Sequence, residues 1–348
     1  MMSHHASLAG KVAVVTGASS GVGRALARAF GDRGASVALI ARTRDALDAA
    51  AEEIVRAGGR AMVFPLDVSD AQAVESAADR VVAEWGCIDI WLNDAMVSVF
   101  APVMDTRPEE YRRVMEVNYL GYVHGTLSAL KHMRARNQGL IVQIGSALAY
   151  RSIPLQSAYC ASKAAIRGFT DSLRSELVHD GSRIRIVMLQ LPAVNTPQFQ
   201  VVRNRLPKHP QPVPPIYQPE VIAEAALYAV EHPARELWIG WSTLKAIVGQ
   251  RLFPGLLDRY LARRAYDAQQ TDALRHAHAD NVDVPVPGDR GAHGEFDRWS
   301  RRGSTELWLR MHRHAFAAAL FAMFIAVGIA AAVPQDSPAS DPYGITFP

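Results

Sequence analysis

Short, almost continuously apolar runs alternate with longer Ala-rich segments between Lys11 and about Gly240. Strands that are covered by helices on both faces of a parallel sheet have this apolar character, whereas the covering helices repeat about every 3.6 residues. Such alternation predicts right-handed βαβ units, and therefore an α/β fold with a doubly wound parallel sheet (a Rossmann fold). The predicted strands are 12–15, 36–40, 61–64, 88–92, 140–144 and 184–189, and the predicted helices include 23–33 and 43–57.

The composition changes after the last of these strands. Residues 195–219 are rich in proline, so the sequence predicts no regular element there. Because long loops in compact domains usually have a function, we interpret this one as a segment that covers the substrate, with a passive surface linker as the alternative. Farther on, residues 252–265 predict an amphipathic basic helix, and the Pro- and Gly-rich residues 279–294 predict a flexible linker.

These shifts divide the chain into an N-terminal arm (1–10), a single catalytic domain (11–240), a helical extension with its linker (241–300) and a C-terminal segment (301–348). Within the last segment, residues 315–333 carry no charge, and as a helix at ~1.5 Å per residue they would span roughly 28 Å, close to the thickness of a bilayer core. Arginines precede this stretch and no Lys or Arg follows it. The sequence therefore predicts a membrane-associated enzyme, anchored by a transmembrane helix over 315–333, with its catalytic domain on the cytoplasmic side. An interfacial helix, or a helix that packs against a partner, is the alternative.

Charge and cysteine content narrow the classes of function. The formal net charge of +3 is too small for a dedicated nucleic-acid-binding protein, so we expect a small-molecule substrate. The two cysteines, Cys87 and Cys160, have neither the spacing of a metal site nor that of a disulfide framework, which indicates a reducing compartment. Residues 1–11 lack the long apolar run of a secretory signal.

A glycine-rich turn follows the first strand and opens a helix. Residues 16–23 read Thr-Gly-Ala-Ser-Ser-Gly-Val-Gly. Glycines let the backbone turn tightly and approach a pyrophosphate, whose charge is stabilised by the free N–H groups and the dipole of the helix. At the first βα junction this motif predicts a dinucleotide site. The binding residues predicted there are Thr16, Gly17, Ser19, Ser20, Gly21, Val22 and Gly23.

The end of the second predicted strand bears on the choice between NAD and NADP. A carboxylate at this place would bind the ribose 2′-hydroxyl of NAD, but Ala41 is small and Arg42 is cationic, which suits the 2′-phosphate of NADP. Arg24, just inside the first helix, is a second candidate cation. Asp67, followed by Val68, is placed to accept from the adenine amino group, with a helix N-cap as its competing role. The sequence therefore favours NADP(H) over NAD(H).

Tyr159 and Lys163 lie four residues apart in an Ala-rich helical run, so their side chains share one helix face. A free phenol has a pKa of about 10 and is a poor base at neutral pH, but a nearby ammonium group lowers that pKa. Ser146, which follows the strand 140–144, can hydrogen-bond the reacting oxygen. Asn118 can hold a water that relays protons to Lys163. The combination predicts a catalytic centre, whereas a Tyr-x-x-x-Lys pair alone is usually structural.

The order and spacing of these motifs resemble the short-chain dehydrogenase/reductase family over about residues 8–240. The resemblance implies a seven-stranded Rossmann sheet, with Tyr159 as acid/base and a cofactor contact, and with Lys163 as the tuner of Tyr159 and a ribose ligand. It also assigns Ser146 to the substrate oxygen and Asn118 to the proton relay. A homodimer or homotetramer is implied too, with helices equivalent to 118–136 and 159–178 at the subunit interface.

The chain departs from the family pattern at two glycine positions. It has Asn93-Asp94-Ala95-Met96 where the family usually has Asn-Asn-Ala-Gly, and Pro192-Ala193 where the family has Pro-Gly. We expect the lost glycines to change the local backbone and the affinity for the cofactor. The cofactor contacts implied in these two segments are Asn93, Ala95, Pro192 and Thr196.

The leading hypothesis is an NADP(H)-dependent oxidoreductase that transfers a hydride between NADPH and a carbonyl or alcohol substrate. The predicted membrane segment suggests that this substrate is lipophilic. A second hypothesis is a membrane-tethered NADP-binding regulator or scaffold without turnover. A third is epimerisation or dehydration of a nucleotide sugar on the same scaffold.

Overall fold

A parallel sheet forms the centre of the computed structural model, which describes residues 7–275, 278–313 and 323. Its seven strands pair in the order β12-β7-β6-β4-β1-β2-β3, all parallel. The order reverses between β1 and β4, and doubly wound sheets bind ligands in the crevice at such a reversal. The predicted α/β fold is confirmed. The strands are β1 (Val12–Thr16), β2 (Ser36–Ala41), β3 (Arg60–Pro65), β4 (Ile90–Asn93), β6 (Gly139–Ile144), β7 (Ile184–Gln190) and β12 (Glu236–Trp238).

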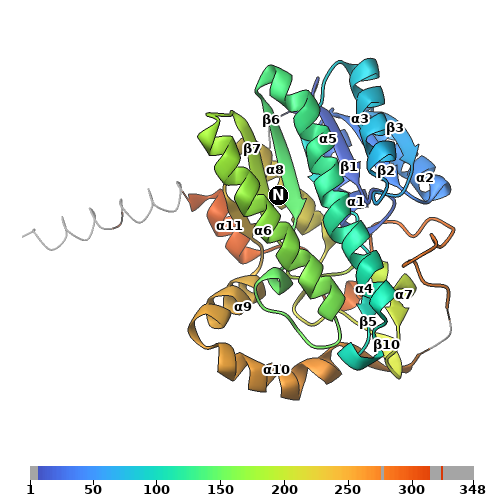
Figure 1. Cartoon of the computed structure of the whole chain (residues 1–348), viewed down its shortest axis with the longest axis vertical. Helices are drawn as coiled ribbons and strands as arrows, with labels where there is room; N and C mark the ends of the chain where they lie inside the picture. The colour runs from blue at the N-terminus through green and yellow to red at the C-terminus, as the bar shows by residue number, and fades with distance from the viewer. Residues whose placement is uncertain (1–6, 276–277, 314–322, 324–348) are drawn as a thin grey trace, which may run out of the picture. The chain divides into compact units, whose positions relative to one another are not determined.

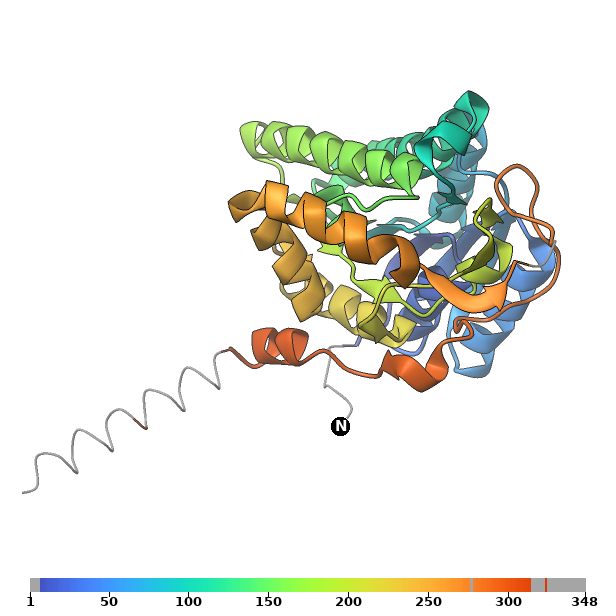
Figure 2. The same ribbon diagram turned by 90° about the horizontal axis from the view of Figure 1, so that it is seen from below.

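Helices cover both faces of this sheet (Figures 1 and 2). Helix α1 contacts α2 and α8 on one face, and α3 contacts α5 on the other, where α4 contacts α6. All five residues of β1 are buried between the layers, which explains its continuous apolar run. The helices are α1 (Gly21–Gly31), α2 (Arg44–Arg56), α3 (Ala71–Trp85), α4 (Pro108–Met115), α5 (Gly121–Arg136), α6 (Ser157–His179) and α8 (Pro219–Glu231).

The Pro-rich segment 195–219 contains short regular elements, contrary to the prediction. Proline restricts but does not abolish pairing in strands of two or three residues at a sheet edge. Three small sheets hold the segment in place: β5 with β9, β10 with β13, and β14 with β11 and β8. These elements are β5 (Val99–Phe100), β8 (Ala193–Val194), α7 (Gln198–Val201), β9 (Arg203–Asn204), β10 (Lys208–Pro210), β11 (Ile216–Tyr217), β13 (Gln270–Leu274) and β14 (Ser300–Arg301).

The C-terminal extension folds with the sheet. Contacts divide the chain into two compact units, residues 1–306 and 307–348, so the extension 241–300 belongs to the first unit. Its amphipathic helix is confirmed as α10 (Pro254–Ala268), preceded by α9 (Trp241–Leu252), and α11 (Thr305–Met311) crosses the boundary between the units.

Residues 279–294 differ from the predicted flexible linker. Val282 is fully buried in the main hydrophobic core. The Gly21 N–H group, at the start of α1, donates to the Gly291 carbonyl at 3.1 Å. The proline and glycine content correctly predicted that residues 279–294 form no helix or strand. It carried no information on these long-range contacts.

The predicted membrane location is wrong, because the described residues contain no helix that could span a membrane. No helix in the described ranges 7–275 and 278–313 is long and apolar enough to cross a bilayer. The segment 315–333, on which the prediction depended, lies outside the described residues apart from Met323.

Two glycines allow α1 to start directly beneath the first turn. Gly17 has a left-handed φ of 74°, and a Cβ atom there would lie 2.9 Å from the Ala95 backbone. A Cβ atom on Gly23 would lie 2.2 Å from the Gly17 carbonyl oxygen, closer than any real contact. The glycines are therefore required by the approach of α1 to the turn.

We expect Gly23→Ala to lower the free energy of unfolding by about 1–3 kcal/mol, because the added methyl group forces α1 away from the turn. Gly168→Ala is the matched control, since Gly168 lies inside α6 with open space where a Cβ atom would be. There the change should raise stability by ~0.5–1 kcal/mol through helix propensity. Urea unfolding followed by circular dichroism measures both, and equal effects would contradict this account.

Candidate active site

A cavity of about 420 Å³ extends along the carboxyl ends of the central strands. The glycine turn, Arg42 and Asp67 line one part of it, and Ser146, Tyr159 and Lys163 line another. A third part is formed by the 195–219 segment with α9 and α10. The structure therefore brings the predicted dinucleotide site and the predicted catalytic residues into one continuous space.

The glycine turn has the shape and donors that a pyrophosphate requires. Gly17 and Gly21 are both left-handed, and Ser19 and Ser20 also line the cavity. The hydroxyl of Ser20, which precedes α1, does not cap the helix; the Gly21 N–H donates to the Gly291 carbonyl at 3.1 Å, and the Gly23 N–H donates to the Asp94 carboxylate. Among the described residues, this turn with Arg42 fits a dinucleotide by both its backbone and its charge.

Asp67 and Arg42 lie at the same end of the cavity. Burial opposes ionisation of Asp67, but hydrogen bonds from Ser69 and Arg113 hold the pKa of its carboxyl below the usual range. The cap of α3 is Asp70, whose side chain accepts from the Ala73 N–H at 3.0 Å, so Asp67 does not have that competing role. Arg113 was not identified from the sequence, because its position on α4 gives no motif.

Arg24 has another partner and does not line the cavity. Its guanidinium group is almost fully buried and donates to both carboxylate oxygens of Glu53 at 3.0 Å. It also donates to the Ala46 carbonyl at 2.7 Å. The expectation that Arg24 assists at the 2′-phosphate is therefore not met, since a carboxylate of α2 already neutralises it.

Lys163 is the most constrained residue of the predicted catalytic centre. Only 2% of it is exposed, and its ammonium group donates to the Ile144 carbonyl at 2.7 Å and to the Tyr122 hydroxyl at 3.1 Å. It lies 5.6 Å from the centre of the Tyr159 ring. Burial lowers the pKa of Lys163 to about 8, while the nearby Asp94 carboxylate acts in the opposite direction. An ammonium group has three donors, so one remains for a ligand.

Tyr159 and Ser146 face the same part of the cavity. Burial raises the pKa of the Tyr159 phenol, and a hydrogen bond with Ser146 offsets part of that increase. Two hydrogen bonds hold Ser146: its backbone N–H donates to the Gln190 side-chain oxygen at 2.9 Å, and its hydroxyl accepts from the Leu148 N–H at 3.1 Å. Burial therefore raises the pKa of the Tyr159 phenol, where the sequence predicted that the Lys163 ammonium would lower it.

Asp94 is a charged group of the cavity that the sequence analysis did not assign. Burial raises its pKa to about 7, and the Lys163 ammonium and the Gly23 N–H act in the opposite direction. The sequence did contain a sign of this group, because Asp94 occupies a position where the family pattern has an asparagine. The Asp94 carboxyl therefore titrates near neutral pH, at a place between the glycine turn and Lys163.

Four predicted site residues do not line the cavity: Thr16, Gly23, Asn93 and Asn118. Asn93 is fully buried and bonds Trp91, Thr126 and Gln143, which ties β4 to α5 and β6. Thr16 accepts from the N–H groups of residues 94 and 95.

Asn118 lies in a π-helical turn, Glu116–Leu120. Its side chain bonds the N–H and carbonyl of Val97, at 2.8 and 3.0 Å, and donates to the Ser162 hydroxyl at 3.1 Å. Through these hydrogen bonds the side chain of Asn118 holds the loop after β4 against α6. A proton relay at this residue would therefore have to use its main chain.

The remaining predicted contacts do line the cavity, and the lost glycines cause no strain. Met96 and Ala193 both line it, and neither has a positive φ. Met96 and Ala193 therefore have backbone conformations that any L-residue adopts, and the expected effect of the lost glycines on cofactor affinity stays a prediction. The lining set includes Val22, Val68, Ala95, Pro192 and Thr196.

The third part of the cavity is mainly apolar. Its walls come from the loop after Ser146, from the 195–219 segment and from α10, with few polar side chains such as Gln156 and Gln211. The apolar lining residues include Leu148, Ile153, Phe199, Val213, Leu261 and Ala265.

Comparison with known proteins finds similarity to dehydrogenases and reductases. The family model described as short chain dehydrogenase matches residues 11–206. The uncharacterized oxidoreductase YxnA of Bacillus subtilis is 34% identical over 264 residues, which cover 75% of this chain and 74% of that protein. The fatty acyl-CoA reductase of Acinetobacter baylyi is 34% identical over 229 residues, covering 65% of this chain and 75% of that protein.

Solved structures agree in fold and contain both forms of the cofactor. An alcohol dehydrogenase from the archaeon Thermococcus sibiricus, complexed with 5-hydroxy-NADP, has a TM-score of 0.58 and 30% identity, covering 66% of this chain and 95% of that one. An NAD⁺-bound xylitol dehydrogenase has a TM-score of 0.52 and 30% identity, covering 54% of this chain and 72% of that one. The neighbours thus support a nicotinamide cofactor without separating NADP from NAD.

Proposed function

The chain belongs to the short-chain dehydrogenase family, and from that premise we propose that it is an NADP(H)-dependent reductase of lipophilic carbonyl compounds. The observation that carries the proposal is one cavity that holds the glycine turn, Arg42, the Ser146–Tyr159–Lys163 group and an apolar wall.

Proton donation to the substrate is assigned to Tyr159. A bound, reduced nicotinamide supplies the hydride. As negative charge develops on the carbonyl oxygen, Ser146 donates a hydrogen bond to it and the Tyr159 phenol gives its proton. Burial keeps that phenol protonated, which is the form that reduction needs. The Lys163 ammonium then stabilises the phenolate, and its remaining donor can hold the ribose.

The preference for NADP(H) is supported by the cations at the end of β2. Arg42 and Arg113 both lie next to Asp67, and no carboxylate occupies the last residues of β2, Ile40 and Ala41. Guanidinium groups bind phosphate through paired N–H donors, whereas NAD would offer them only a neutral hydroxyl. The two cations thus supply the charge that a 2′-phosphate needs.

A lipophilic substrate is supported by the apolar third of the cavity. Burying apolar substrate surface against such walls is favourable by about 25 cal/mol per Å², so an alkyl or ring system gains affinity there. Similarity to a protein named a fatty acyl-CoA reductase points in the same direction. We also propose a homodimer or homotetramer through α5 and α6, on which the apolar Leu127 and Val178 are 57% and 74% exposed.

Tyr159→Phe should lower kcat for aldehyde or ketone reduction at least ~100-fold, because the proton donor is lost. The dissociation constant for NADPH should stay within about threefold, since the glycine turn, Arg42 and Lys163 are unchanged and the phenylalanine ring keeps the shape of the tyrosine ring. Steady-state kinetics on a panel of medium- and long-chain carbonyls and a fluorescence titration measure the two. Tyr260→Phe, on the exposed side of α10, is the control. A Tyr159→Phe enzyme that keeps a tenth or more of its activity would refute the assignment.

The rate of reduction should fall as the pH rises through about 8, because Lys163 then loses its proton. Asp94→Asn removes the carboxylate that stabilises the Lys163 ammonium, so the pKa of Lys163 should fall and the decline should begin at lower pH. The pH profile of kcat/KM measures this shift. Asp105→Asn, on an exposed turn, controls for a general change of charge. Identical profiles for wild type and Asp94→Asn would rule out the coupling.

Arg42→Ala should weaken NADPH binding roughly 10–100-fold, the loss expected for charge-assisted hydrogen bonds to a phosphate. NADH binding should be nearly unchanged, because its ribose carries no phosphate. Arg44→Ala removes an exposed arginine two residues away, which pairs with Asp48 at 3.2 Å, and is the matched control. Titration with both nucleotides gives the comparison, and an equal loss for NADH would mean that Arg42 acts on the fold rather than on the 2′-phosphate.

A further inference from the structure

A segment of the C-terminal extension forms part of the cofactor end of the cavity. Residues 278–291, which we call the strap, run past α7, α4 and the start of α1, in the region where Figure 1 labels α4 and α7. The strap residues that line the cavity are Asn281, Pro285, Val286, Gly288 and Arg290. They share it with the glycine turn, Arg42 and Asp67, so the strap is a wall of the same space.

Backbone hydrogen bonds, one apolar side chain and three carboxylates attach the strap along its length; Asp289 accepts from the Arg24 guanidinium at 3.3 Å, and Asp280 and Asp283 bind Arg203. The Asn281 N–H donates to the Val201 carbonyl at 2.9 Å, and the Gly291 carbonyl accepts from the Gly21 N–H at 3.1 Å. Between these points Val282 is fully buried in the main core. A passive linker would not insert a core residue or bond to the glycine turn.

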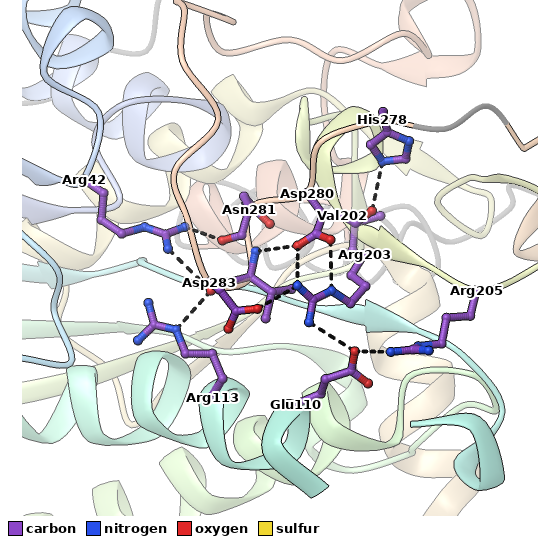
Figure 3. Close-up of polar contacts among 11 residues, drawn as sticks. Arg42, Glu110, Arg113, Val202, Arg203, Arg205, His278, Asp280, Asn281 and Asp283 are labelled. Carbon is purple, nitrogen blue, oxygen red and sulfur yellow. Dashed lines mark hydrogen bonds and ion pairs between the residues drawn. The ribbon is translucent and has the colours of Figure 1, made fainter. Parts of the chain in front are cut away.

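Strap carbonyls also hold the two cations next to Asp67. Arg42 donates to the carbonyls of Asn281 and Val282, and Arg113 donates to the Val282 carbonyl at 3.0 Å (Figure 3). A guanidinium group has five donors in a fixed plane, so these contacts orient both groups without using all their donors. The strap thus positions Arg42, which lines the cavity at the place proposed for the 2′-phosphate, and Arg113, which binds Asp67.

Arg203 joins the strap to the 195–219 segment by ion pairs. Its guanidinium group donates to both oxygens of Asp280 at 2.9 Å and to Asp283 at 2.7 Å (Figure 3). A third donor reaches Glu110 of α4 at 3.1 Å, a carboxylate of which only 2% is exposed. Paired contacts of this kind are among the stronger ion pairs in proteins, and here one arginine joins three elements.

From these contacts we propose that the strap is a clamp on the adenosine end of bound NADP(H), closed by Arg203, so that release of the cofactor requires the strap to open. The proposal rests on the proposed NADP(H) site and adds how that site retains its cofactor. Because Arg203 lies in β9 beside α7, whose Phe199 and Val201 line the cavity, opening the clamp also loosens the substrate end.

The decisive variant is Asp280→Asn combined with Asp283→Asn in the full chain, which keeps the side-chain shapes and removes the charges that Arg203 binds. NADPH release is followed by stopped-flow fluorescence after a chase with excess NADP⁺. We expect the release rate to rise at least ~10-fold, with a higher dissociation constant. Asp272→Asn, which breaks the exposed ion pair with Lys208 outside the cavity, should change neither value.

A release rate within twofold of wild type would overturn the clamp. A lower dissociation constant would overturn it as well, because it would mean that the strap competes with the cofactor. If the wild-type chain binds neither NADPH nor NADH, the proposed function fails together with the clamp. If it binds NADPH but the double variant releases it at the wild-type rate, only the clamp fails.

Limited proteolysis of the wild-type chain gives a second test that depends on neither activity nor a variant. Trypsin can cut the strap after Arg290, which is only partly exposed. Saturating NADPH should slow this cut severalfold if the strap closes on the cofactor. Equal rates of cleavage with and without NADPH would contradict the clamp even if the double variant failed to fold.

Discussion

The burial of one ammonium group determines how the rest of the site is arranged. Lys163 is almost removed from solvent, and a buried cation is stable only if partners replace its water. The Ile144 carbonyl at the end of β6 and the Tyr122 hydroxyl on α5 supply them. Tyr159 lies four residues before Lys163 on the same face of α6, and both side chains line the cavity.

The cofactor end and the substrate end of the cavity meet at Tyr159 and Lys163. Different side chains shape the two ends. At the cofactor end, glycines remove side chains so that the backbone itself can approach a phosphate, and arginines supply charge. At the substrate end, apolar side chains from three parts of the chain exclude water. The C-terminal extension contributes to both, with α9 and α10 at the substrate end and the strap at the cofactor end.

Much of the fold could be predicted, because buried parallel strands and amphipathic helices leave local patterns. The observed strands β1, β2 and β6 lie within one or two residues of their predicted ranges. Partners distant in sequence could not be predicted: the contact between Arg42 and Asn281 spans 239 residues, and nothing near Arg24 indicated that Glu53 would bind it. Asn93 matched a motif, yet its bonds lie in the core, since a motif gives residue type but not the direction of a side chain.

Transfer of isotope from cofactor to product tests the central claim most directly. The full chain would be incubated with NADPH that carries deuterium at both C4 positions of the nicotinamide and with a panel of aldehydes and ketones of increasing chain length. The alcohols would then be analysed by mass spectrometry. The account predicts one deuterium on the carbinol carbon, with turnover that increases with apolar chain length. If NADPH binds but no deuterium appears in any product, the chain is a nucleotide-binding protein without this activity, and the account is contradicted.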